Sequence, residues 1–214
     1  MDKHCPYARF FQSNFRTTGN HEKQSKRIWL TDIDLSALRD FIISQGTTRI
    51  IKKKEYLLQQ GDMCRHIGYI SEGMFRYKRL DSNGDEHITG YSLEGDLVGE
   101  YSSCLCGRPS LSSIQAIKDS RVHLITYTEL EQFWNSSPEN QRIGRILAEQ
   151  LFAMTYRRLT DSYCCTAEER YIDFMNRYPD LKELIPLKEI ASFIGVTPET
   201  VSAIRKKLLK TDKS

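Results

Sequence analysis

The chain has 214 residues, of which 39% are hydrophobic and 28% are charged, and its formal net charge is +3. This length suffices for one large domain or two modest ones, and the composition excludes a wholly disordered chain. The longest uninterrupted hydrophobic run has four residues, Leu151 to Met154, which excludes a membrane-spanning segment, and the N-terminus lacks the apolar core of a secretory signal. We therefore expect a soluble protein of the cytoplasm with no membrane partner.

Charge is distributed unevenly along the chain. From Val201 onward five Lys and Arg residues accompany a single acidic residue, Asp212, whereas the rest of the chain is close to neutral. A basic end on a near-neutral body is typical of an electrostatic footprint for a polyanion. A solvated basic tail explains the charge equally well, so a motif has to decide between the two.

The cysteines and histidines lack the spacing of a metal, redox or nucleophilic site. Cys104 and Cys106 are one residue apart and Cys164 and Cys165 are adjacent, whereas zinc ribbons and thioredoxin-like sites need two intervening residues. Cys5 stands alone near the N-terminus, so no cluster there could hold an iron–sulfur centre. We expect structural or incidental reduced thiols, no bound metal, no catalytic residue and no enzymatic activity.

Residues 28–136 form a predicted domain of short strands that follows a polar N-terminal arm over residues 1–27. The domain begins with a helix predicted over residues 34–44. Asn83 and Gly84 predict a two-residue type I′ hairpin turn. Many short antiparallel strands at regular spacing are typical of a sandwich or a jelly-roll barrel. The predicted strands are 49–58, 66–70, 73–80, 87–93 and 121–126.

Residues 137–165 are predicted to form a long helix and hinge, with Ser137 as N-cap and Pro138 in its first turn. Two apolar stripes on opposite sides of this helix imply burial on both sides. They favour a dimer of paired long helices over the alternative, a central helix in a monomeric core. We place the first stripe at the dimer interface: Ile143, Ile146, Leu147, Leu151 and Met154. The second stripe consists of Ala148, Phe152, Tyr156 and Leu159.

Two pairs of residues have the spacing of a capping box, which marks the start of a helix. Thr128 and Glu131 predict one helix before the long one, and Thr166 and Glu169 predict another that runs to about Arg177. The second pair opens the last predicted domain, residues 166–214.

Residues 187–209 have the signature of a helix-turn-helix. The first helix carries apolar residues at i, i+3, i+4 and i+7 and ends at Gly195, where a left-handed backbone favours glycine. Thr197 caps the second helix and Pro198 opens it. Two short helices joined by a glycine-containing turn are typical of this DNA-binding motif. The apolar residues that we expect to be buried are Leu187, Ile190, Ala191, Ile194, Val201, Ile204 and Leu208.

The opposite side of the second helix is polar and basic. In this docking mode the N-terminal residues of the second helix contact base edges, and basic side chains contact phosphates. Glu199 can accept a hydrogen bond from a cytosine amino group. The residues predicted to meet DNA are Thr197, Pro198, Glu199, Thr200, Ser202, Ala203, Arg205 and Lys206.

Over roughly residues 34–209 the sequence resembles the Crp/Fnr family of bacterial transcription regulators, most firmly at residues 95–100, 189–191, 195 and 199–202. The resemblance implies an α+β fold: an N-terminal antiparallel jelly-roll barrel of the cyclic nucleotide-binding type, a long dimerisation helix and a C-terminal helix-turn-helix. It also implies a homodimer that binds double-stranded DNA, with RNA polymerase as a further candidate partner. A small-molecule effector, of unidentified structure, would bind near Gly99, Glu100, Tyr101, Ser110, Leu111, Leu151 and Thr155.

The sequence departs from the family pattern in three places. Ser110 stands where members that bind cyclic AMP place an arginine against the phosphate, and Leu151 replaces a second arginine, so we do not expect cyclic AMP as the effector. The sequence ends at Ser214, where relatives continue into a β-hairpin wing, so most or all of the wing is expected to be missing. Pro198 and Ala203 replace arginines of some relatives, so the target sequence should differ.

An alternative from another class stays open. In that alternative the barrel is an effector-binding module, and the C-terminal helices dock a protein rather than DNA.

Overall fold

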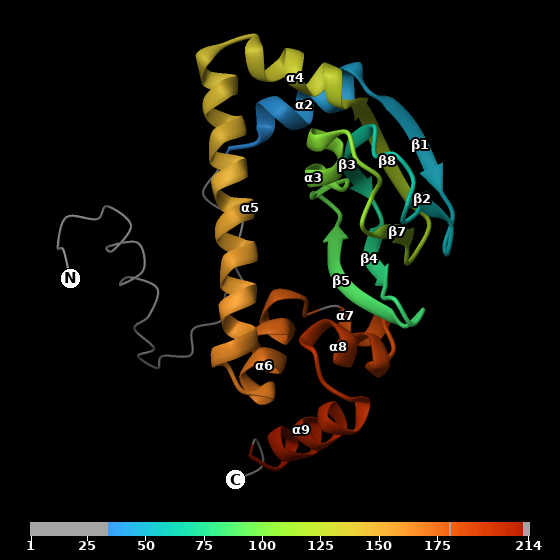
Figure 1. The fold of residues 1–214 in the computed structure, drawn as a ribbon, viewed down its shortest axis with the longest axis vertical. Coiled ribbons are helices and arrows are strands. Elements are labelled where there is room, and N and C mark those ends of the chain that lie inside the picture. The colour runs from blue at the N-terminus through green and yellow to red at the C-terminus, as the bar shows by residue number, and fades with distance from the viewer. Residues whose placement is uncertain (1–33, 180, 212–214) are drawn as a thin grey trace, which may run out of the picture.

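The computed structural model describes residues 34–179 and 181–211, so the arm predicted over residues 1–27 lies outside the described residues. Figure 1 shows a pair of β-sheets, a long helix (α5) beside them, and a group of short helices (α6 to α9) at one end of the molecule. This mixture of antiparallel sheets and helices agrees with the predicted α+β class.

The eight strands of the described residues form two four-stranded antiparallel sheets, with orders β1-β8-β3-β6 and β2-β7-β4-β5. Strands that neighbour each other in space are mostly distant in sequence, so the chain crosses repeatedly between the two sheets. Strands β6 and β7 were not predicted. The strands are β1 (Thr47–Ile51), β2 (Tyr56–Leu58), β3 (His66–Glu72), β4 (Met74–Leu80), β5 (Glu86–Leu93), β6 (Leu97–Val98), β7 (Ser113–Ala116) and β8 (Ser120–Thr126).

Apolar side chains from both sheets fill the space between them. Ile70 and Val122 from one sheet and Phe75 and Ile114 from the other are fully buried and belong to one core cluster. Burial of side chains of this size contributes about 1.5–3 kcal/mol each, so the sandwich has a core of its own.

The prediction of one strand over residues 49–58 is wrong, because β1 and β2 belong to different sheets. The chain turns between them at Lys54, whose φ of 73° is the only positive φ of a non-glycine residue among those described. Glu55 N donates to Lys52 O across this turn (2.9 Å). A lysine in a left-handed turn gives no sequence signal of the kind that Gly or Asn gives, so the break was not visible.

The hairpin between β4 and β5 is also different from the prediction. Gly84 has a φ of 85°, but Asn83 does not have the positive φ that a type I′ turn requires. Gly84 N donates to Asp81 O (3.1 Å), and the Asp81 carboxylate accepts hydrogen bonds from Asn83 N (2.9 Å) and Asp85 N (3.0 Å). The His87 ring and these two backbone N–H groups hold the pKa of Asp81 below its usual value. A carboxylate-organised loop therefore replaces the two-residue turn.

Four helices belong to the sandwich side of the molecule: α2 (Ser36–Gln45), α3 (Tyr101–Cys106), α4 (Tyr127–Asn135) and α5 (Pro138–Cys164). The capping box of α4 uses Thr126 and Glu129, not the predicted Thr128 and Glu131. The helix starts earlier because β8 ends directly at Thr126, whose side chain is then free to accept from Glu129 N (3.2 Å). Helix α5 begins as predicted, with Ser137 accepting from Asn140 N (3.1 Å).

The C-terminal helices are α6 (Ala167–Arg177), α7 (Leu181–Leu184), α8 (Leu187–Ile194) and α9 (Pro198–Thr211). The predicted capping box at Thr166 and Glu169 is confirmed. These helices have no separate core, because their buried residues join those of β4 and β5 in a single cluster. The C-terminal domain is therefore packed on the outer face of the β2-β7-β4-β5 sheet.

Candidate nucleic-acid interface and barrel hollow

Helices α8 and α9 form the predicted helix-turn-helix. Helix α8 ends at Gly195, whose φ of 71° is left-handed, and a Cβ added there would meet nothing within 4 Å. The requirement for glycine is therefore conformational rather than steric. Thr197 Oγ1 accepts from Thr200 N (3.3 Å) and so caps α9, which opens with Pro198 as predicted.

The apolar stripe of α9 faces the core. Val201 is fully buried and Ile204 is 7% exposed, and Leu208 packs against the same cluster. The opposite side of the helix consequently lies at the surface. Of the residues predicted to meet DNA, the exposed ones are Thr197, Glu199, Ala203 and Lys206, and the half-buried ones are Pro198, Thr200, Ser202 and Arg205.

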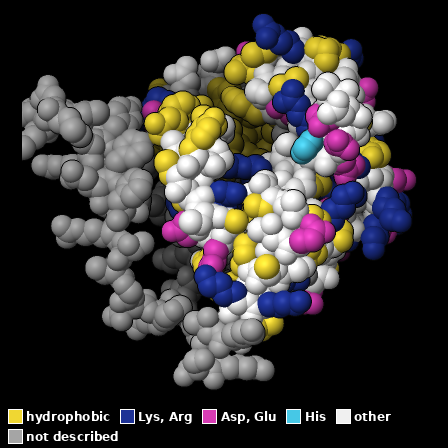
Figure 2. All heavy atoms as spheres, turned by 60° about the horizontal axis from the view of Figure 1, so that its bottom comes forward, with side chains coloured by type: hydrophobic (Ala, Val, Ile, Leu, Met, Phe, Trp, Pro, Cys, Tyr) yellow, Lys and Arg dark blue, Asp and Glu magenta, His cyan; other side chains and the backbone are white. Residues whose placement is uncertain are grey.

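The basic residues of α9 differ in how they are held. Arg205 Nε donates to the Tyr171 hydroxyl of α6 (3.0 Å), and its guanidinium lies 6.0 Å from the centre of that ring. Lys207 Nζ pairs with Glu168 (2.5 Å). Lys206 is exposed and forms no ion pair with any described residue. Figure 2 brings this end forward and shows basic and acidic side chains interspersed rather than one continuous basic surface.

Glu199 lies in the first turn of α9, where backbone N–H groups favour a negative charge. A hydrogen bond from its own backbone N–H and one from the Thr197 side chain hold the pKa of Glu199 below its usual value. The carboxylate is therefore ionised at neutral pH and acts only as a hydrogen-bond acceptor.

An ion pair joins the helix-turn-helix to the sandwich. Arg76 of β4 pairs with Glu189 of α8, and these side chains are only 21% and 12% exposed. Arg76 also donates twice to Gln115 Oε1 of β7, through Nε (3.1 Å) and Nη2 (2.7 Å). The C-terminal domain covers Arg76, whose side chain lies on the face of β4 that packs against α8. Because Ile114, the residue before Gln115, lies inside the sandwich, β7 connects the interior of the sandwich to this ion pair.

Two further polar contacts reach the edge strand β5. Ile88 N donates to Ser192 Oγ of α8 (2.8 Å). Arg158 of α5 donates to Thr89 O and to Phe193 O (3.4 Å), and its guanidinium lies 4.3 Å from the centre of the Phe193 ring. Arg158 thus contacts β5 and α8 from the long helix and holds three elements together.

Tyr91 of β5 lies in the middle of this interface. Its ring centre is 6.2 Å from that of Phe174, 5.6 Å from that of Tyr178 and 5.6 Å from that of Phe193. Burial and the nearby Glu189 carboxylate raise the pKa of the Tyr91 phenol. The helix-turn-helix therefore packs on the sandwich through an aromatic cluster as well as through the ion pair.

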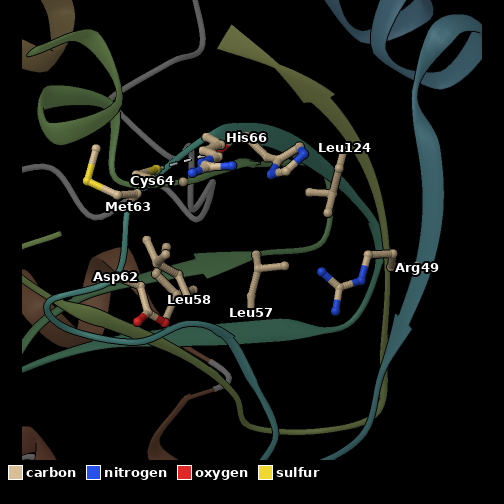
Figure 3. Close-up of a pocket in the computed structure, with 11 residues that line it drawn as sticks. Arg49, Leu57, Leu58, Asp62, Met63, Cys64, His66 and Leu124 are labelled. Atoms are coloured by element: carbon tan, nitrogen blue, oxygen red, sulfur yellow. Dashed lines mark hydrogen bonds between the residues drawn. The ribbon is translucent and has the colours of Figure 1, made fainter. Parts of the chain in front are cut away.

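The sandwich contains a hollow of about 180 Å³. Figure 3 shows Arg49 pointing from β1 into this hollow toward Leu57, with Asp62 on the other side. The apolar part of its wall consists of Leu57, Leu58, Met63, Ile114 and Leu124. The polar residues at the hollow are Arg49, Asp62, Arg65 and His66, and Cys64 and Gly99 complete the lining.

Of the seven residues predicted for an effector pocket, only Gly99 lines this hollow. Glu100 caps α3 instead, because its carboxylate accepts from Ser102 Oγ (2.7 Å) and Ser103 N (3.2 Å). Ser110 is 2% exposed, and its hydroxyl donates to Ser112 O (2.7 Å).

The other four predicted pocket residues lie apart from the lining of the hollow. Tyr101 and Leu151 pack against the core that α2 and α4 share with β3, while Leu111 is 52% exposed. Thr155 is exposed and donates to Leu151 O (2.8 Å). Sequence reasoning missed Arg49, Arg65 and His66, since no motif marks them.

The structure changes the assignment of the two stripes on α5. Leu147 is 6% exposed within the protomer and Leu151 packs against the same core, so these two residues of the stripe predicted at a dimer interface face the protein's own sandwich. Ile143, Ile146 and Met154 on that stripe are half-buried. The other stripe is exposed: Phe152 at 70%, Tyr156 at 46% and Leu159 at 53%.

Among the described residues there is no group of three or more His, Cys, Asp or Glu side chains that could hold a metal ion. Within the same part of the chain, none of the helices has the length and hydropathy needed to cross a membrane.

Comparison with known proteins agrees with this arrangement. Residues 48–137 match the family model of the cyclic nucleotide-binding domain. The chain is 27% identical over 166 residues to Electron transport regulator A of Shewanella oneidensis, a match that covers 72% of this chain and 65% of that protein. It is 27% identical over 186 residues to Transcriptional activator protein Anr of Pseudomonas protegens, covering 80% of this chain and 72% of that protein.

The fold is similar to that of FixK2 from Bradyrhizobium japonicum, with a TM-score of 0.65 and 20% identity over 78% of this chain and 86% of that chain. A barrel of the cyclic nucleotide-binding type joined to a helix-turn-helix defines a class of transcription regulators. Within that class, the chain is similar to regulators of the Crp/Fnr family.

Proposed function

We propose that the protein is a homodimeric, sequence-specific DNA-binding regulator whose barrel responds to a small-molecule effector other than cyclic AMP. One observation carries the proposal: α9 buries Val201 and Ile204 and exposes Glu199 and Lys206, with Ser202 half-buried. A helix that is apolar on its buried side and polar on its exposed side can enter a major groove while its apolar side chains stay in the protein core.

The residues of α9 have different roles in this proposal. Glu199, near the N-terminus of the helix, accepts a hydrogen bond from a cytosine amino group and contributes sequence preference. Lys206 contacts phosphate, which contributes affinity on all sequences. Arg205 reaches a second phosphate from its position over the Tyr171 ring.

The exposed stripe on α5 supports a homodimer. Phe152, Tyr156 and Leu159 follow one another at helical spacing, and the rings of Phe152 and Tyr156 stack with their centres 6.0 Å apart. A contiguous apolar stripe of this kind fits the same stripe of a second copy, which would pair two long helices. Two recognition helices would then meet half-sites one turn of DNA, about 34 Å, apart.

The barrel is proposed as the sensing part. The strand orders of its two sheets support the jelly-roll form, and the hollow supplies space for a small ligand. Ser110, whose hydroxyl is bonded to Ser112 O, offers no cation to a cyclic phosphate. The cations that line the hollow are Arg49 and Arg65. The exclusion of cyclic AMP therefore depends on the position of Ser110 alone, where a charge-assisted hydrogen bond of about 1.5–3 kcal/mol is lost.

The test is selection of bound DNA from a random pool, followed by fluorescence anisotropy on the selected site and on a scrambled duplex over a range of salt concentrations. We expect Lys206→Ala to weaken binding to both duplexes and to lower the salt slope by about one. Glu199→Ala should reduce discrimination between the two duplexes by about 1–3 kcal/mol. Lys52→Ala also removes one positive charge, but from the sandwich rather than from α9, so it serves as the charge-matched control.

Three outcomes would contradict parts of the proposal. Equal losses on both duplexes for Glu199→Ala would remove its base-reading role. Tighter binding on addition of cyclic AMP would overturn its exclusion as effector. The absence of salt-dependent DNA binding at low ionic strength would favour the alternative, in which the C-terminal helices dock a protein.

A further inference from the structure

An arginine points into the apolar interior of the sandwich. Arg49 lies in β1 two positions before the buried Ile51, so both side chains belong to the inner face of their sheet. Its partner across the sheet is Val122 of β8, which is fully buried. Figure 3 shows the guanidinium aimed into the hollow toward Leu57 of the opposite sheet. A charged residue at a core-facing position is unusual and calls for a physical reason.

The charges at the hollow are not paired with one another. Within the described part of the chain, the Arg49 guanidinium forms no ion pair and no hydrogen bond, and the same holds for the side chain of Arg65. Asp62, the one carboxylate among the lining residues, lies on the other side of the hollow and pairs with neither arginine. The lining therefore carries an excess of positive charge. The planar fork of a guanidinium matches a carboxylate, which it can hold through two parallel hydrogen bonds.

The apolar part of the wall comes from both sheets. Leu57 and Leu58 of β2 and Ile114 of β7 belong to one sheet, and Leu124 of β8 belongs to the other. Ile114 is fully buried and Leu124 is 6% exposed, so this part of the wall is fixed by the sandwich core. The hollow has a volume of about 180 Å³. Since a cavity of about 150 Å³ accepts benzene, the hollow has room for a molecule of about six to nine non-hydrogen atoms.

The hollow opens to solvent on the side of its polar residues. Arg49, Asp62 and Met63 are all exposed, so a small molecule can enter without any movement of the strands. An anionic group held by Arg49 would direct the rest of the molecule along Leu57 toward Asp62. The Asp62 carboxylate repels a second anionic group at that end. The arrangement thus favours a ligand with one negative charge and an apolar body.

We propose that the hollow binds a small monocarboxylic acid, with the carboxylate on Arg49 and an apolar body of about three to six carbon atoms against the leucines. The proposal names a chemical class for the effector, and it rests on the proposed function only for that role, because binding to the hollow involves no DNA. The site also differs from the pocket that the family resemblance implies, since the two share only Gly99.

The test titrates the full-length protein with acetate, butyrate and hexanoate at fixed pH and ionic strength and follows the methyl NMR signals of Ile114 and Leu124. These signals should shift, and each added methylene should raise the affinity about fourfold until the hollow is full. Hexanol, which lacks the charge, should bind about 10- to 100-fold more weakly than hexanoate. Adipate, the dicarboxylate of the same length, should also bind more weakly, and Asp62→Asn should narrow its difference from hexanoate.

Two arginine variants test the role of the charge. Arg49→Met should weaken hexanoate binding about 10- to 100-fold and leave hexanol binding unchanged, which shows that the hollow itself is intact. Arg121→Met is the matched control, because Arg121 lies on β8 of the same sheet, opposite Ile50, and its exposed side chain is outside the lining. This control should change the binding of neither compound.

The proposal is overturned if hexanoate leaves the Ile114 and Leu124 signals unchanged, if wild type and Arg49→Met bind it equally, or if affinity does not grow with chain length. Should circular dichroism show that Arg49→Met is unfolded, the comparison of hexanoate with hexanol on wild type decides the role of the charge. Fluorescence anisotropy with the selected duplex keeps the two proposals apart. A protein that binds hexanoate but no DNA contradicts only the proposed function, and one that binds DNA but no hexanoate contradicts only the present inference.

Discussion

Replacing Glu189 by Gln should loosen the attachment of the helix-turn-helix to the sandwich. Glu189 on α8 pairs with Arg76 on β4, which Gln115 holds in place by two hydrogen bonds. The amide keeps the size of the side chain but removes its charge. The Arg76 guanidinium then stays at a covered interface without its counter-charge.

The magnitude follows from the burial of the pair. Removing one partner of a fully buried ion pair costs about 3–5 kcal/mol, and breaking an exposed pair costs about 0–1 kcal/mol. The side chains of Arg76 and Glu189 are only 21% and 12% exposed to solvent. We therefore expect Glu189→Gln to lower the free energy of unfolding by about 2–3 kcal/mol, which is closer to the buried limit.

Urea denaturation of wild type and variant, followed by far-UV circular dichroism, measures this loss. Lys52→Gln is the control, because it breaks an ion pair with Asp119 whose two side chains are 64% and 62% exposed. The control should change stability by less than about 0.5 kcal/mol. Arg76→Met and the double variant Arg76→Met/Glu189→Gln complete a double-mutant cycle, with an expected coupling energy of about 1 kcal/mol or more.

The reasoning fails if Glu189→Gln destabilises the protein no more than Lys52→Gln does. It also fails if the cycle gives no coupling, since the two residues would then act independently.

The remaining predictions concern the long helix and the start of α4. Phe152→Glu should convert the proposed dimer to a monomer in sedimentation or light-scattering measurements while leaving the protomer folded, because Phe152 is 70% exposed. Leu147→Ala should instead cost the protomer about 2–5 kcal/mol, because this side chain lies in its core. A monomer that forms with Leu147→Ala but not with Phe152→Glu would restore the original assignment of the stripes. Thr126→Ala should cost about 1 kcal/mol in thermal or urea unfolding through loss of the N-cap, whereas Thr128→Ala should be nearly neutral. The reverse order would contradict the capping box at Thr126.

The helix-turn-helix could be predicted from the sequence because its determinants are local. The apolar spacing of α8, the left-handed Gly195 and the cap at Thr197 all lie within about one turn of the residues that they organise. The long helix was predictable for the same reason, from Ser137 and Pro138 at its start.

Features that depend on distant parts of the chain could not be predicted. Periodicity showed that α5 has two apolar stripes, but only tertiary packing decides which stripe faces the sandwich, and Leu147 belongs to that one. The sequence gives no sign that Arg76 is covered, because its partner Glu189 is 113 positions away.

The contacts that the helices make with β5 also predict how the sandwich would behave without them. This strand is the last of its sheet, and its outer backbone groups at Ile88 and Thr89 are occupied by Ser192 and Arg158. Unoccupied strand edges recruit other strands and lead to aggregation. The C-terminal helices therefore shield the sheet from self-association, and a fragment that ends before α5 should be less soluble than the whole chain. Any movement that frees the helix-turn-helix from the sandwich would uncover this edge for as long as the movement lasts.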